Sequence, residues 1–149
     1  MEAELPGEYE RLRRFILYHL GGFTLGLVRV NDPHQRDNII ASLREALAAD
    51  DAQLVRLDLT NLHPLSLRAA IDADPDVRRA LLSAPSRLAL AVVGAEHLIE
   101  AEADKTGRPA FAAALNIERD ALHRAVPAPI ILFLTDHAMD RLDLAAPDF

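Results

Sequence analysis

Residues 88–94 read Leu-Ala-Leu-Ala-Val-Val-Gly, an unbroken apolar run that decides the fold. A strand that is apolar at every position is covered on both faces, which is typical of the centre of a parallel sheet. A second run of this kind, Ile-Ile-Leu-Phe-Leu, occupies residues 130–134. Both are too short to span a bilayer, which takes about 20 apolar residues in a helix. The two runs therefore predict buried strands of an α/β protein.

On either side of these runs, helical periodicity alternates with further short strands. We expect strands at 23–30, 53–59, 87–93 and 130–135, and helices at 8–20, from 33 to the aspartates at 50 and 51, and at 62–73, 74–82, 94–103, 109–125 and 136–142. The helix start at 33 is the best marked: Asp32 is placed to cap it, Pro33 suits its first position, and Gln35 could complete a capping box. Gly21 and Gly22 are expected to end the first helix.

The order of these elements is a helix followed by four β-α units. Each connection between strands is long enough to hold a helix. We therefore predict a three-layer α/β/α sandwich with a mostly parallel sheet of four or five strands, preceded by an N-terminal helix. Since no repeat or linker divides the sequence, residues 1–149 are expected to form a single domain.

Composition excludes several classes of function. The net charge is −7, from 23 acidic and 16 basic residues, which disfavours binding to nucleic acid or to an anionic membrane. The absence of cysteine excludes disulfides and thiol catalysis. None of the six histidines has the spacing that places two metal ligands on one helix face, so no metal or other cofactor is expected. With no signal peptide visible, we expect a cytoplasmic protein.

In open parallel sheets, ligands bind beyond the carboxyl ends of the strands. Polar residues follow each expected strand there, and the candidate ligand-binding residues are Asp32, His34, Arg36, Glu96, Thr135 and Asp136. The alternative interpretation is that Asp32, Asp136 and either Thr60 or Asn61 only cap helices or turns. No catalytic residue is indicated, because no serine has a glycine-flanked elbow.

The loop after the first strand, residues 31–36, reads Asn-Asp-Pro-His-Gln-Arg. A phosphate-binding loop needs glycines, whose backbone amides surround the phosphate, and a lysine that neutralises it. This loop has neither, Asp32 adds a repelling charge, and Pro33 removes an amide donor. Arg36 could replace the lysine in part, but it is expected to lie inside the helix. Ordinary ATP binding is therefore not predicted.

Four segments carry a family resemblance: residues 23–27 (Phe-Thr-Leu-Gly-Leu), 115–119 (Leu-Asn-Ile-Glu-Arg), 129–135 (Pro-Ile-Ile-Leu-Phe-Leu-Thr) and 146–149 (Ala-Pro-Asp-Phe). With this layout the chain resembles the AAA-like, P-loop ATPase domain of bacterial signalling proteins of the STAND class, often joined to tetratricopeptide repeats. The resemblance implies a P-loop-NTPase-like fold and a further strand after Phe149. It also implies that the chain is excised from, or lies N-terminal in, a longer protein.

Three functions are compatible with these features. The leading hypothesis is a non-catalytic regulatory or protein-interaction domain, a degenerate P-loop fold in bacterial signalling or defence, whose partner is another protein or another domain of the same polypeptide. The alternative is a divergent nucleotide-binding domain or hydrolase, which requires Asp32, His34, Glu96 and Asp136 to converge.

The third is a homo-oligomer formed through the first helix, with Tyr9 and Tyr18 as anchors. Asn116 and Arg119, three apart on the expected helix at 109–125, form either a partner contact or an exposed hydrogen-bonded pair.

Overall fold

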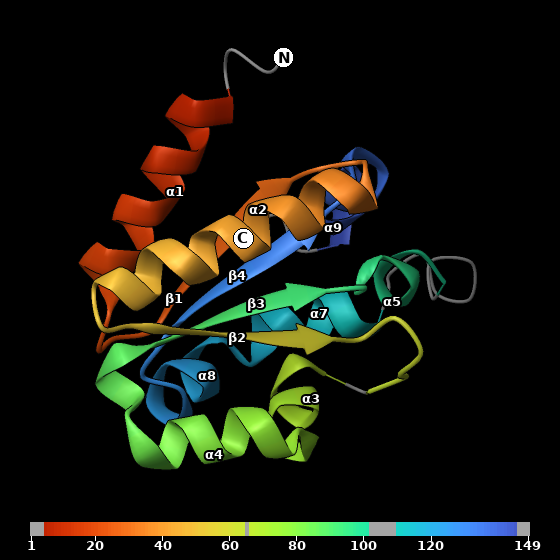
Figure 1. The fold of residues 1–149 in the computed structure, drawn as a ribbon. Coiled ribbons are helices and arrows are strands. Elements are labelled where there is room, and N and C mark those ends of the chain that lie inside the picture. Colours follow the sequence, from red (N-terminus) through yellow and green to blue (C-terminus); the bar gives the residue numbers. More distant parts are fainter. Residues whose placement is uncertain (1–4, 65, 102–109, 146–149) are drawn as a thin grey trace.

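The computed structural model describes residues 5–64, 66–101 and 110–145, and Figure 1 shows its fold. In chain order, the elements are α1 (Leu5–His19), β1 (Thr24–Arg29), α2 (Pro33–Ala49), β2 (Gln53–Asp58), α3 (Leu67–Ala73), α4 (Pro75–Ser83), η1 (Pro85–Arg87), β3 (Leu88–Val93), α5 (Glu96–Ala101), α7 (Ala110–Ile117), α8 (Arg119–Ala125), β4 (Pro129–Leu134) and α9 (Asp136–Ala145). Three parts of the sequence predictions lie outside the described residues: the end of the expected helix at 94–103, the start of the one at 109–125, and the segment 146–149.

The four described strands form one sheet in the order β1-β4-β3-β2, and every neighbouring pair is parallel. All residues of β3 and β4 are buried, which confirms that the two apolar runs are central strands. β1 and β2 form the edges. β1 is only half-buried, because the outer edge of an edge strand stays open. Both of its faces are covered, as expected: Leu25 and Leu27 pack against one apolar cluster and Val28 against the other.

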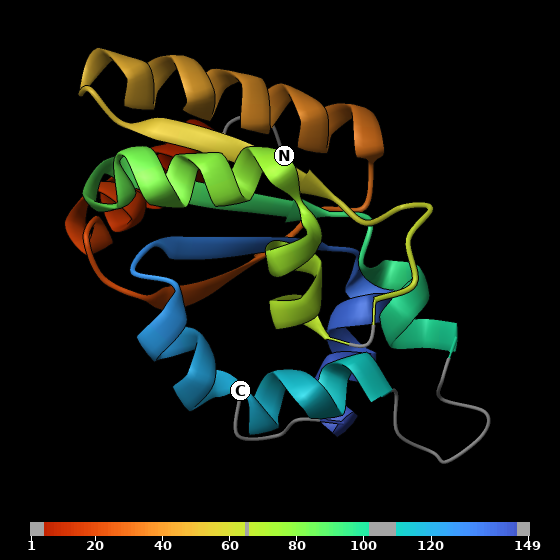
Figure 2. The same ribbon diagram turned by 90° about the horizontal axis from the view of Figure 1, so that it is seen from below.

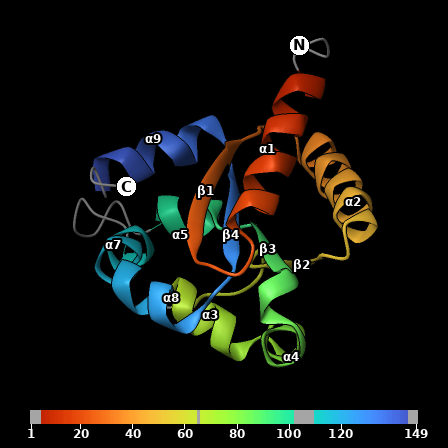
Figure 3. The same cartoon turned by 90° about the vertical axis from the view of Figure 1, so that its left-hand side faces the viewer.

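Helices cover both faces of the sheet, as predicted, and make three layers (Figures 1 and 3). On one face α1 and α2 pack in an apolar cluster that includes Ile16, Leu43 and Phe133. On the other face the larger cluster contains residues of α3, α4, α7 and α8, which Figure 2 shows from below, and of α5 and α9. None of the described helices is long and apolar enough to cross a membrane.

Several predicted helix boundaries differ from the structure, and two of the predicted helices differ most. The helix expected at 62–73 begins at Leu67, because the Ser66 hydroxyl caps it by accepting a bond from the amide of Ala69. The helix expected at 109–125 is two helices. Glu118 separates them with φ −89° and ψ 3°, a conformation outside the helical range, although its amide still donates to the carbonyl of Ala114.

The marked start of α2 is confirmed, with one difference. Asp32 is the cap and Pro33 the first helical residue. The carboxylate accepts its bond from the amide of His34, at 3.0 Å, rather than from that of Gln35, which a capping box would use.

Candidate functional site

The sheet has a topological switch point between β1 and β4. These strands are neighbours, but the helices that follow them lie on opposite faces: α2 belongs to one apolar cluster and α9 to the other (Figure 3). The crevice beyond the carboxyl ends of such strands is where ligands bind in open α/β sheets. The candidates Asp32, His34, Thr135 and Asp136 all follow these two strands, as expected.

Three side chains connect the carboxyl ends of β1 and β4, at the edge of the sheet that we call the rim, and we call Arg29, Asn31 and Asp136 the rim network. Asn31 donates from Nδ2 to Oδ2 of Asp136 at 2.9 Å, and its Oδ1 accepts from the Asp136 amide at 2.8 Å. Arg29 donates to the other carboxylate oxygen, Oδ1, at 2.9 Å. Both oxygens of Asp136 thus have partners in the chain, and the contacts tie the first turn of α9 to the end of β1.

The N-terminus of α2 carries its own anion. Its exposed first turn attracts negative charge through unpaired amides and the helix dipole. The Asp32 carboxylate supplies this negative charge, because it accepts a hydrogen bond from the His34 amide. Pro33 has no amide hydrogen to donate. Arg36 lies within the helix and pairs with Asp37, its Nε 3.1 Å from Oδ1. The interpretation of Asp32 as a cap is confirmed.

The remaining rim candidates are engaged separately. The Thr135 hydroxyl caps α9 by accepting from the amide of Ala138 at 3.2 Å, so Thr135, and not Asp136, is the capping residue there. Glu96 begins α5, and among the described residues no hydrogen bond or ion pair joins it to Asp32, His34 or Asp136. The contacts therefore gather Arg29, Asn31 and Asp136, rather than the four residues that the divergent-enzyme alternative requires.

The residues expected to contact a partner are in different positions in the structure. Tyr9 is used inside the chain: its hydroxyl donates to the carbonyl of Ser42 at 2.8 Å and ties α1 to α2, and burial raises the pKa of that hydroxyl. Tyr18 is 84% exposed. Asn116 and Arg119 do not share a helix, since α7 ends at Ile117 and α8 begins at Arg119.

The charges of the rim are set by hydrogen bonds. Bonds from Asn31 and Arg29 lower the pKa of Asp136, so this carboxyl is ionised at neutral pH and is not suited to act as a general acid there. Desolvation raises the pKa of Asp58, but bonds from the Thr60 hydroxyl and amide, with the Arg56 charge, outweigh it, and the net shift is downward. Within residues 5–64, 66–101 and 110–145, no three His, Asp or Glu side chains group to hold a metal ion.

We predict that acid destabilises the protein through these carboxyls. A carboxyl whose folded pKa lies below its unfolded value, about 3.9 for Asp, stabilises the fold above that value, and this contribution is lost as pH falls through the folded pKa. The free energy of unfolding in urea should therefore change little between about pH 7 and 5 and fall below about pH 4. In Asp58→Asn the fall should be shallower, and an equally steep fall would contradict the assignment.

Sequence reasoning named Asp136 as a candidate and placed Asn31 in the loop after the first strand, but it missed Arg29 and the bonds among the three. Asn31 and Asp136 are 105 residues apart, so no local pattern signals their pairing. The one available signal for Arg29 is a charged residue at the end of an otherwise apolar strand.

The all-parallel sheet with helices on both faces defines the class: a three-layer α/β domain with a P-loop-NTPase-like fold. A solved structure of the ORC2 protein of Aeropyrum pernix, in its ADP form, is similar to this chain, with a TM-score of 0.53 and 14% sequence identity. The match covers 95% of this chain and 44% of that one. No family model and no curated protein matches the sequence. At this identity, the likeness concerns the fold alone.

Proposed function

We propose that this chain is a non-catalytic regulatory or protein-interaction domain with a degenerate P-loop-like fold. The observation that carries the proposal is the Asp32 carboxylate on the His34 amide at the start of α2. In a P-loop domain, the helix after the first strand presents its amides to phosphate. Here the Asp32 carboxylate accepts a hydrogen bond from one of these amides and repels a second anion.

The neighbouring groups support the same proposal. Charge-assisted hydrogen bonds are worth about 1.5–3 kcal/mol each, so the loss of several donors weakens phosphate binding by orders of magnitude. Pro33 lacks a donor, the loop has neither glycine nor lysine, and Arg36 pairs with Asp37. The similar ORC2 structure was solved in its ADP form, but the residues of this loop do not fit a nucleotide phosphate.

The resemblance of the sequence to STAND-class proteins suggests the larger protein to which the domain belongs. We propose that the domain belongs to a longer cytoplasmic signalling protein of the STAND class and that its partner is another domain or another protein. The −7 net charge supports a partner other than nucleic acid.

Calorimetric titration of the chain with Mg-ATP and with Mg-ADP tests the proposal. We expect no binding tighter than about 1 mM. Asp32→Asn keeps a capping oxygen but removes the charge, and it should not restore binding because the glycines and lysine are still missing. Micromolar affinity that weakens in Arg36→Ala would show instead a divergent nucleotide-binding domain.

A further inference from the structure

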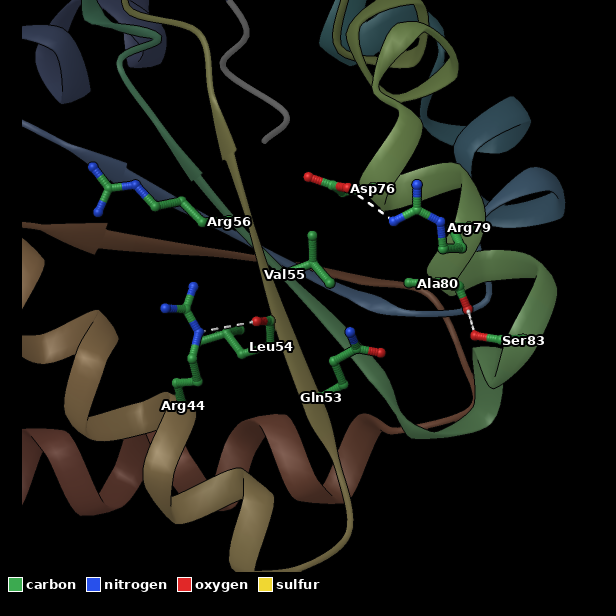
Figure 4. A pocket seen from close by; sticks show the side chains of 9 residues that line it. All are labelled: Arg44, Gln53, Leu54, Val55, Arg56, Asp76, Arg79, Ala80 and Ser83. Atoms are coloured by element: carbon green, nitrogen blue, oxygen red, sulfur yellow. Dashed lines mark hydrogen bonds and ion pairs between the residues drawn. The ribbon is translucent and has the colours of Figure 1, made fainter.

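A groove of about 350 Å³ runs along the free edge of β2, away from the rim. β2 pairs with β3 on one side and is the last strand of the described sheet on the other. Helices α2 and α4 flank this edge, so the groove has a strand for its floor and a helix on each side (Figure 4).

The floor presents backbone groups suited to an added strand. The Leu54 carbonyl accepts a bond from Nε of Arg44, so the backbone of Leu54 points away from β3. Because alternate residues of a strand point their amides and carbonyls to the same side, Arg56 faces the groove as well. The Arg44 bond is 3.4 Å long, beyond the usual 2.7–3.2 Å of such bonds, and an incoming amide can displace it easily.

The two walls differ in chemistry. On the α2 side, Arg44 and Arg56 extend beside the strand (Figure 4), and Arg56 also donates to Oδ1 of Asp37 at 3.0 Å. On the α4 side, Val55 points toward Ala80, with Arg79 and Asp76 paired further out. A strand laid in the groove turns alternate side chains to opposite walls. One set would meet guanidinium groups and the other would meet apolar carbons.

We infer that the β2 groove binds an extended peptide segment in which acidic and apolar residues alternate. Its backbone pairs with Leu54 and Arg56, its carboxylates face Arg44 and Arg56, and its apolar side chains face Val55 and Ala80. The inference rests on the proposed interaction role and supplies a partner chemistry for it. Strand addition of this kind derives affinity from main-chain bonds and specificity from alternate side chains.

Charge distinguishes this occupant from a second copy of the chain. The groove lining holds three arginines and a single aspartate, in a protein whose net charge is −7. Arg56 pairs with Asp37 and Arg79 with Asp76, so Arg44, which makes no ion pair within the described residues, is the main cation for an acidic partner. A symmetric pairing of two β2 edges would bring the arginines of one copy close to those of the other, whereas an acidic strand complements them.

The test uses a fluorescein-labelled peptide, Thr-Glu-Val-Glu-Val-Glu-Thr, titrated with the intact chain and followed by fluorescence anisotropy. We expect saturable binding that weakens at least about tenfold in Arg44→Glu and several-fold as salt rises from about 50 to 300 mM. A peptide with lysine in place of each glutamate should not bind. Hydrogen exchange at the Leu54 and Arg56 amides should slow when the acidic peptide is bound.

The matched control is Arg11→Glu, an equal change of charge on an exposed residue of α1. Equal weakening by the two variants, equal binding of the lysine peptide, or no binding of the acidic peptide at about 1 mM would overturn the inference. So would a dimer in light scattering that Arg44→Glu dissolves, which would identify a second copy as the occupant. Nucleotide titration separates the two proposals: ATP binding alone overturns the non-catalytic role, and absent peptide binding alone overturns the groove assignment.

Discussion

Replacing Gly94 with alanine is expected to lower the free energy of unfolding by about 3 kcal/mol. Gly94 follows β3 with φ +77°, in the left-handed region that side chains disfavour. A Cβ there would lie 2.5 Å from the backbone nitrogen of Thr60 and 2.8 Å from its Cα, closer than real contacts allow. Backbone has to move to relieve this contact. The turn at Thr60 is held by hydrogen bonds to Asp58, so moving it costs free energy.

Urea unfolding of Gly94→Ala and Gly21→Ala separates the two effects. Gly21 also has a positive φ, +87°, but a Cβ there would meet nothing within 4 Å. Gly21→Ala should therefore show only the conformational cost of about 1–2 kcal/mol. Equal losses in the two variants would mean that the loops after β2 and β3 are not packed as closely as the structure places them.

Replacing Phe133 with alanine should destabilise the protein by about 3–5 kcal/mol, a large part of the 5–15 kcal/mol typical of a domain. Phe133 is fully buried in the central strand β4, on the face that α1 and α2 cover. Alanine would leave a cavity in the cluster that joins these helices to the sheet. The loss combines the transfer free energy of the ring with the cost of the cavity.

Two further variants serve as references for the loss measured in Phe133→Ala. Phe133→Leu keeps most of the volume and should lose clearly less. Leu82, on α4, is 85% exposed, and Leu82→Ala should change the free energy of unfolding by less than about 0.5 kcal/mol. A similar loss in Phe133→Ala and Leu82→Ala, measured by urea titration, would contradict the placement of Phe133 in the core.

Local features of the chain were predictable where neighbouring residues settle them. The apolar runs at 88–93 and 130–134 predicted buried parallel strands, and Asp32 with Pro33 predicted the start of α2. The break at Glu118 was missed because no glycine or proline marks it.

The sequence by itself determined the α/β class, the parallel strands and the cap of α2 by Asp32, because periodicity and capping act between residues close in the chain. Only the tertiary structure decided that β1 and β2 are the edges, that Asn31 meets Asp136 across 105 residues, and that Arg44 and Arg56 flank an open strand. These relations depend on the strand order β1-β4-β3-β2. That order follows from how the layers pack as a whole, which no short stretch of sequence encodes.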